Sequence, residues 1–168
     1  PGHEMIGWSC TMNGSTYTSF IGFSGESNNQ STELLNQGWG LTSLLATFTD
    51  GFVQTPKDLE ERFQYFNQEF EKDPKGPFYL MANLFEITQK DCESLIREVY
   101  RYTTHPEKPT SKFGLLVNPK KNEGAGCGSF AIHFLEKIKS FQDISNLFKR
   151  NYKLPYFLFG RGEILPDN

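Results

Sequence analysis

The chain has 168 residues, with 17 basic and 20 acidic side chains, which is the ordinary size of one compact domain. Its formal net charge of -3 gives no basic face, so neither nucleic acid nor an anionic membrane surface is expected as a partner. Aromatic residues make up 15% of the chain and predict a folded, aromatic core. No apolar run approaches the roughly 20 residues that span a membrane, and nothing in the pattern indicates an oligomeric state.

The first predicted element is a β-hairpin at the start of the chain. Residues His3–Met12 and Ser15–Phe23 are rich in β-branched and aromatic side chains, and they flank Asn13-Gly14, a pair typical of a two-residue turn. This turn pairs the strands symmetrically, so His3 would face Ser24. A polar surface loop and a segment of sheet or irregular structure are expected to follow.

The middle of the chain predicts two helices and two strands. Thr55 and Pro56 provide an N-cap and a first turn for a helix that runs to about residue 73. Residues 78–87 are interpreted as a buried strand, and a capping box at Thr88–Asp91 begins a helix with Cys92 on its apolar face. A short strand is expected at 113–117. Towards the end of the chain, we expect a helix from residue 140 and a strand near 154–159.

The sequence Gly-Ala-Gly-Cys-Gly-Ser-Phe at residues 124–130 passes from a flexible turn into a helical pattern. Cys127 is therefore expected at a helix N-terminus, where unpaired N–H groups stabilise a thiolate and can bind an oxyanion. The structural alternative is a buried cysteine in a glycine-rich turn.

A nucleophilic thiol needs a base, and the chain has three histidines. His133 follows Cys127 by six residues on the same helix, two turns away, and cannot reach the thiol. His105 is interpreted as a solvated loop residue. His3 begins the first strand, which could hold its ring against a helix N-terminus, and its alternative is a frayed residue near the chain start.

His3-Glu4-Met5-Ile6-Gly7-Trp8 at the start of a strand, followed much later by Cys127-Gly128-Ser129-Phe130 at the start of a helix, resembles the permuted NlpC-type papain-like hydrolases. The similar branch includes YiiX-like proteins and lecithin retinol acyltransferase-like enzymes, in which the histidine strand precedes the cysteine helix. One departure is Gly126, where many members carry Asn. The resemblance implies an α+β, circularly permuted papain-like fold in which residues 1–168 form a single domain and a small antiparallel sheet packs on the cysteine-bearing helix.

The resemblance also implies catalytic roles. Cys127 would be the nucleophile, His3 the general base, and a polar residue on the second hairpin strand would orient the imidazole. The hairpin register places Ser24 opposite His3 and Glu26 one pleat further on. Glu26 is favoured because a carboxylate stabilises imidazolium better than a hydroxyl, and Asn28–Asn29 are alternatives if the strand extends.

These roles predict a cysteine hydrolase, a peptidase or amidase that forms a thioester on a peptide or acyl-amide substrate, such as a cell-wall peptide or a lipid-linked amide. Neither metal-ligand spacing nor a phosphate-binding or dinucleotide fingerprint is present, so no metal or cofactor is expected. One alternative class is a lipid acyltransferase or esterase, and another is a non-catalytic ligand-binding module on the same fold. The papain order, with Cys10 as nucleophile and His105 or His133 as base, is disfavoured because Cys10 lies within a strand.

Cysteine usage and the chain start bear on the compartment. Cys10 and Cys92 can pair only if the fold brings them together in an oxidising compartment, which would leave Cys127 free. The chain starts at Pro1 without an initiator Met, so we expect that a leader was removed from a secreted or periplasmic protein. A cytoplasmic location is the alternative.

Overall fold

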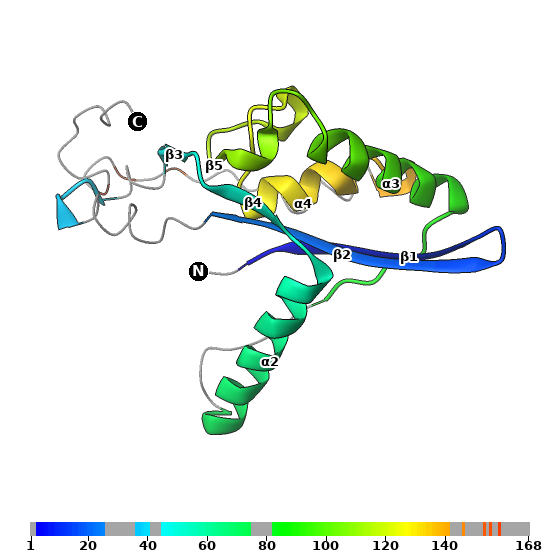
Figure 1. The fold of residues 1–168 in the computed structure, drawn as a ribbon. Helices are drawn as coiled ribbons and strands as arrows, with labels where there is room; N and C mark the ends of the chain where they lie inside the picture. The colour runs from blue at the N-terminus through cyan, green and yellow to red at the C-terminus, as the bar shows by residue number, and fades with distance from the viewer. Residues whose placement is uncertain are drawn as a thin grey trace.

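The computed structural model describes residues 3–25, 36–40, 45–74 and 82–141, together with residues 146, 153, 155 and 158. In this part of the chain, a three-stranded antiparallel sheet has helices on both sides (Figure 1). Helices α3 (Gln89–Thr103) and α4 (Cys127–Leu135) cover one face, and α2 (Pro56–Lys72) extends from the other. The expected α+β class with a small antiparallel sheet is confirmed.

The N-terminal hairpin has the predicted turn and register. Strands β1 (Met5–Met12) and β2 (Ser15–Gly25) are antiparallel, and Met12 pairs with Ser15 across the turn. Asn13 and Gly14 have φ values of 52° and 79°, the positive values that a type I′ turn requires at both positions. The ladder begins at Met5 rather than at His3, so His3 lies just before the paired part of the strand.

The third strand of the sheet is β4 (Gly51–Gln54), which pairs antiparallel with the end of β2. The strand order is β1-β2-β4. A second, two-stranded sheet joins β3 (Thr47–Phe48) to β5 (Phe113–Gly114). The strand expected at 113–117 is therefore shorter, because Leu116 lies beyond the ladder and is 67% exposed.

Both predicted helix starts are confirmed, each with a full capping box. The Thr55 hydroxyl accepts a hydrogen bond from the Asp58 N–H, and the Asp58 carboxylate accepts one from the Thr55 N–H. Thr88 and Asp91 make the same reciprocal pair at the start of α3. These local contacts satisfy N–H groups that have no partner within the helix, which fixes where each helix begins.

The buried strand expected at 78–87 is wrong over its described part. Residues 82–87 form no strand, and Leu84 is 92% exposed, because within the described residues no neighbouring strand pairs with this segment before it enters the Thr88 cap; residues 78–81 lie outside the described part. Helix α2 buries Leu59, but Phe70 is 49% exposed because the helix projects away from the sheet (Figure 1).

At the C-terminal end, the described residues in the region of an expected helix are a short turn and the helical residue Asn146. Residues Lys139–Phe141 form a 3-10 turn where the helix from residue 140 was predicted. The remainder of that helix and the strand expected at 154–159 fall for the most part outside the described residues.

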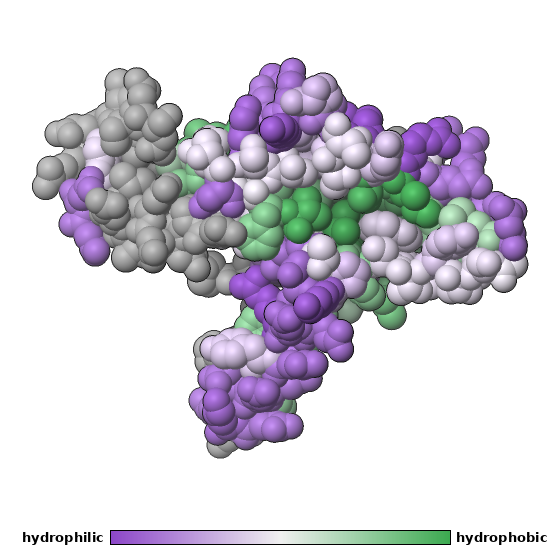
Figure 2. Space-filling view, viewed as in Figure 1, coloured by the Kyte–Doolittle hydropathy of each residue, from purple (hydrophilic) through white to green (hydrophobic). Residues whose placement is uncertain are grey.

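The main core lies between the sheet and helices α3 and α4, and it is aromatic, as the composition predicts. Phe130 of α4 is fully buried and stacks on Phe23 of β2 with 5.1 Å between ring centroids. Phe134 and Tyr102 meet the Phe130 ring edge-on at 4.8 and 5.7 Å. Figure 2 shows that apolar residues also come to the surface between the helices and the strands. Packing of this core sets the position of α4 on the sheet.

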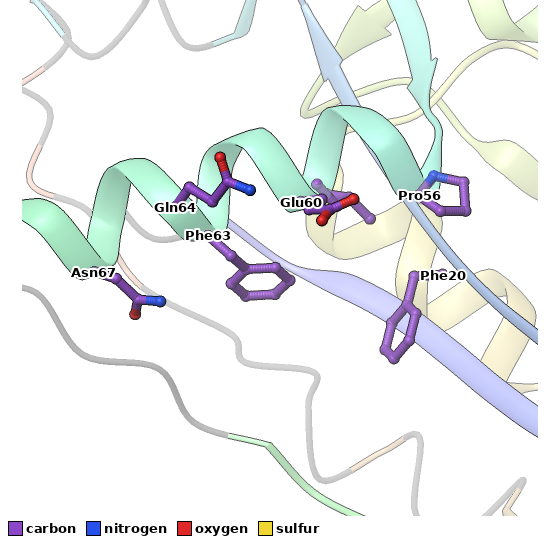
Figure 3. Close-up of a pocket in the computed structure, with 7 residues that line it drawn as sticks. Phe20, Pro56, Glu60, Phe63, Gln64 and Asn67 are labelled. Atoms are coloured by element: carbon purple, nitrogen blue, oxygen red, sulfur yellow. The ribbon is translucent and has the colours of Figure 1, made fainter.

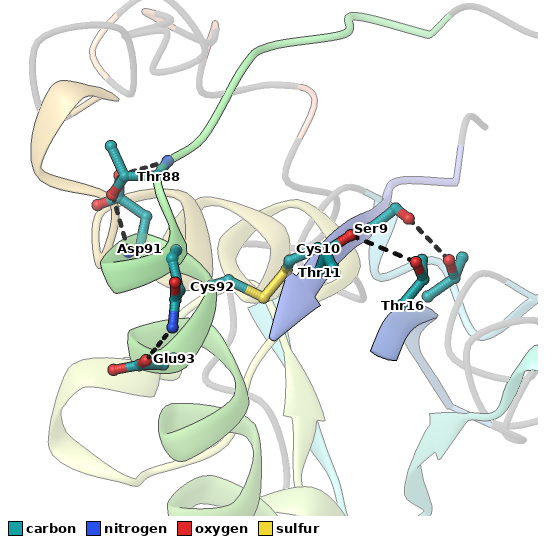
Figure 4. Close-up of a disulfide and its surroundings, with 10 residues drawn as sticks. Ser9, Cys10, Thr11, Thr16, Thr88, Asp91, Cys92 and Glu93 are labelled. Carbon is teal, nitrogen blue, oxygen red and sulfur yellow. Dashed lines mark hydrogen bonds between the residues drawn. A yellow bond between two sulfur atoms is a disulfide. The ribbon is translucent and has the colours of Figure 1, made fainter. Parts of the chain in front are cut away.

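A disulfide between Cys10 and Cys92 joins β1 to α3 across the core (Figure 4). The Cα atoms are 6.3 Å apart, within the range that a disulfide can span, and Cys92 is fully buried. The pairing that the sequence left conditional is therefore present. Because Cys10 is bonded in the middle of a strand, it is not available as the alternative nucleophile.

Candidate functional site

The segment before Cys127 is held against β5. The N–H of Gly114 donates to the Ala125 carbonyl at 3.1 Å, and the N–H of Ala125 donates to the Lys112 carbonyl at 3.1 Å. Gly124 has a φ of 120°, and a Cβ at this position would clash with the Lys112 backbone. A residue with a side chain at position 124 would therefore disturb both the backbone conformation and the pairing that positions Cys127 at the start of its helix.

Cys127 is the first residue of α4, as predicted, and Gly126 is its N-cap. The Ser129 hydroxyl accepts a hydrogen bond from the Gly126 N–H at 2.9 Å and so caps the turn. The first N–H groups of any α-helix have no acceptor within the helix and carry partial positive charge. The thiol thus lies beside backbone donors that can interact with an anion.

Cys127 is also the single free thiol of the chain. The sequence contains three cysteines, and the other two form the disulfide. Its side chain is partly exposed. Next to it, Gly128 leaves room for the carboxylate of Glu4, since a Cβ on Gly128 would lie 2.8 Å from Glu4 Oε2. The residue just before β1 therefore lies against the helix N-terminus that carries the thiol.

His3 is held by a different part of the structure. Its Nε2 donates to Gln54 Oε1 at 2.5 Å, and Gln54, the last residue of β4, is only 4% exposed. Burial lowers the pKa of His3 below its ordinary value; the Gln54 hydrogen bond acts in the opposite direction, and the positive charge of Arg62 on α2 lowers the pKa further. The ring is accordingly neutral at neutral pH and is fixed over the sheet.

His3 and Cys127 belong to opposite faces of the sheet. A Cβ on Gly22 would meet the His3 ring at 3.1 Å, so His3 lies on the face to which Gly22 points. The next residue, Phe23, points the other way and stacks on Phe130 of the Cys127 helix. The structure therefore brings Glu4, rather than His3, to the N-terminus of α4.

The sequence predicts Ser24, Glu26 or Asn28–Asn29 as the residue that orients the His3 imidazole. Ser24 lies in β2, pairs with Phe52 and shares the His3 face, but the side chain that hydrogen-bonds the imidazole is Gln54. Glu26 and Asn28–Asn29 lie outside the described residues. Sequence reasoning missed Gln54 because β4 was not recognised as a strand. Had its pairing with β2 been known, alternation would have placed Gln54 beside Gly22 on the His3 side.

The other two histidines are occupied elsewhere. His105 is partly exposed, and its Nδ1 accepts a hydrogen bond from the Glu107 N–H at 3.3 Å. His133 is 1% exposed and lies in the core, where its Nε2 donates to Glu98 Oε1 at 2.7 Å. Both placements agree with the expectation that neither ring serves Cys127.

A surface hollow of about 310 Å³ lies between β2 and α2 (Figure 3). Phe20 and Phe63 supply its aromatic part, and Glu60, Gln64 and Asn67 are among its polar lining residues. Phe20 packs over Gly7 on the same face of the sheet as His3. The hollow is therefore on the side opposite to Cys127.

Within the described residues, no three His, Cys, Asp or Glu side chains gather closely enough to hold a metal ion. Of the helices in that same part of the chain, none is both long and apolar enough to cross a membrane. Comparisons with protein-family models, curated proteins and solved structures found no match to this chain.

Proposed function

We propose that the chain is a cysteine hydrolase in which Cys127 attacks the carbonyl carbon of an amide or acyl substrate. The observation that carries the proposal is the placement of the single free thiol, partly exposed, as the first residue of α4. A thiol in this position is close to backbone N–H groups that favour negative charge on sulfur and on a developing oxyanion. The flanking glycines Gly126 and Gly128 add no side chains of their own next to the sulfur.

The proposed reaction forms and breaks one thioester. The Cys127 proton passes to a base, the thiolate adds to the carbonyl, and the leaving amine departs with that proton as the thioester forms. Water then adds to the thioester, and collapse of the intermediate releases the carboxylic acid and restores the thiol. The N–H groups at the start of α4 would hold the carbonyl oxygen in both additions.

His3 is the proposed base, and this role requires its ring to leave Gln54. His3 precedes the first ladder pair at Met5, so the hairpin hydrogen bonds do not fix its backbone. Its neighbour Glu4 already reaches Gly128 beside the thiol. Rotation of residue 3 around the start of edge strand β1 would therefore carry the imidazole to the Cys127 side.

Acylation by an activated ester tests the nucleophile. We expect the protein to release one equivalent of nitrophenol rapidly from p-nitrophenyl acetate and to carry one acetyl group on Cys127, located by peptide mass spectrometry. Cys127→Ser is the matched variant and should show no burst. Acetylation spread over lysines, with Cys127 unmodified, would contradict the proposal and favour a non-catalytic binding module.

Variants of the imidazole and its partner test the base. His3→Ala should slow acylation of Cys127 without changing the melting temperature by more than a few degrees. Gln54→Leu should release the ring and leave acylation as fast as in the wild type, or faster. If His3→Ala acylates at the wild-type rate, His3 is not the base and the thiol acts without it.

The disulfide supports the proposal of a secreted or periplasmic location. Disulfides persist in oxidising compartments and are rare where thiols are kept reduced. The Cys10–Cys92 bond joins residues that are 82 positions apart, and Cys92 is fully buried, as expected of a structural crosslink. Mass spectrometry of protein trapped with an alkylating agent at cell lysis, from its native host, would test the location: a modified Cys92 would contradict it.

A further inference from the structure

The contact between α3 and α4 centres on a carboxylate in the core. Glu98 of α3, 8% exposed, accepts hydrogen bonds at Oε1 from Arg101 Nη2 at 2.6 Å and from His133 Nε2 at 2.7 Å. Arg101 Nε also donates to Glu98 Oε2 at 2.9 Å, and Lys137 Nζ lies 3.3 Å from Oε1. One negative charge is therefore shared between two permanent cations and an imidazole.

Arg101 extends this cluster to the turn that leads into Cys127. Its Nη1 donates to Asn122 Oδ1 at 2.9 Å, and Asn122 adopts a left-handed backbone conformation with a φ of 59°. The cluster thus connects three parts of the molecule: helix α3, the turn before Gly124, and helix α4 through His133. Whatever weakens the cluster loosens the support of the helix that begins at Cys127.

His133 is the member of this cluster that titrates nearest to neutral pH. The ring is 1% exposed, and its Nδ1 is buried with no hydrogen-bond partner among the described residues. A proton added at Nδ1 would create a buried N–H without an acceptor. It would also raise the net charge of the four-residue cluster from about +1 to about +2, with the added charge on a ring that is almost fully buried.

The other groups around His133 do not offset the cost of adding a proton to its Nδ1. Tyr102 of α3 packs against the imidazole with 5.6 Å between ring centroids, but its buried hydroxyl makes no hydrogen bond within the described residues. At the C-cap of α4, Glu136 forms an ion pair with Lys120 at 2.6 Å. Burial accordingly lowers the pKa of His133, against the opposing effect of Glu98.

We propose that His133 and Glu98 form an acid-sensitive clasp, which opens the contact between α3 and α4 when the imidazole binds a proton. In the closed state, the neutral ring donates to Glu98. In the open state, the ring reaches water and recovers its ordinary pKa near 6.5. Opening is then coupled to uptake of one proton, so its equilibrium constant rises by up to about tenfold per pH unit as the pH falls below 6.5. This proposal does not depend on catalysis by Cys127.

Hydrogen exchange of the full chain, corrected for the intrinsic pH dependence of exchange, tests the clasp. Between pH 7 and pH 5, we expect amides of α3 and α4 to open more readily by up to about tenfold per pH unit, while hairpin amides change less. His133→Gln is the matched variant because its amide can still donate to Glu98 but does not titrate. Its α4 amides should lose most of this pH dependence.

Equal pH dependence of α4 exchange in the wild type and in His133→Gln would overturn the proposal. His3, whose pKa is also lowered by burial, is present in both proteins and cancels in the comparison. If His133→Gln does not fold, NMR titration of the wild-type ring replaces it. A His133 ring that takes up a proton near pH 6.5 with no change in α4 exchange would overturn the proposal equally.

Discussion

Removal of the Cys10–Cys92 disulfide should lower the free energy of unfolding by several kcal/mol. The bond joins residues 82 positions apart, and the loss of chain entropy in the unfolded state for a loop of that length corresponds to about 4.5 kcal/mol at 25 °C. Residual structure in the unfolded chain reduces this effect, so we expect a measured loss of about 2–4 kcal/mol for the Cys10→Ala, Cys92→Ala double variant.

Urea unfolding followed by tryptophan fluorescence measures the change, because Trp8 and Trp39 are each only 8% exposed when folded. Cys127→Ala is the matched control: it removes a thiol that is partly exposed and unbonded, and should change stability by about 0.5 kcal/mol or less. Thiol titration of the denatured wild type without reductant should give one thiol per chain. Three thiols, or a loss below about 1 kcal/mol in the double variant, would refute the reasoning.

Four further outcomes follow from the packing and the charges. Phe130→Ala leaves a cavity at a fully buried position and should cost about 3–5 kcal/mol in urea unfolding; a cost under 1 kcal/mol would contradict the core assignment. Gly7→Val places a side chain where the Phe20 ring lies and should cost about 1–3 kcal/mol, whereas an unchanged midpoint would mean that Phe20 does not cover Gly7. Thr88→Ala should cost about 1 kcal/mol through loss of its cap, and Thr88→Ser should restore most of it. Burial raises the pKa of Glu98, but hydrogen bonds from Arg101 and His133 together outweigh it and lower the pKa from 4.5 to about 2. The contribution of Glu98 to stability is therefore complete above pH 4.5 and is lost as the pH falls towards 2. Glu98→Gln should be less stable at neutral pH and should lose that part of the acid dependence, which urea midpoints at pH 5 and pH 3 would show.

The features that the sequence predicted correctly depend on interactions between near neighbours. Asn13-Gly14 determines its own turn through positive φ values, and with it the pairing of β1 and β2. The Thr88–Asp91 capping box starts α3 through bonds that span three residues. The start of α4 at Cys127 follows in the same way from glycines next to a helical apolar pattern. Each signal lies within a few residues of the feature that it predicts.

The features that the sequence did not predict depend on pairing between distant segments. Strand β4 has four residues, and its position beside β2 follows from the antiparallel pairing of Gly22 with Gln54, which no local pattern indicates. The segment at 82–87 is predicted as part of a strand, but within the described residues it has no strand to pair with. The composition of a short segment does not show which other segment it pairs with. The pattern alone therefore cannot distinguish a paired strand such as β4 from an unpaired segment such as 82–87.

The step from His3 to Glu4 decides which side chain meets the Cys127 helix. Alternate residues of a strand point to opposite faces, so a shift of one residue at the start of β1 would exchange the two. The ladder fixes the register from Met5 onward, and contacts hold each side chain: Gln54 binds the imidazole, and Gly128 leaves space for the Glu4 carboxylate. The same register therefore supports the thiol helix on one face and keeps the imidazole on the other, and release of His3 from Gln54 is the step on which its proposed role as the base depends.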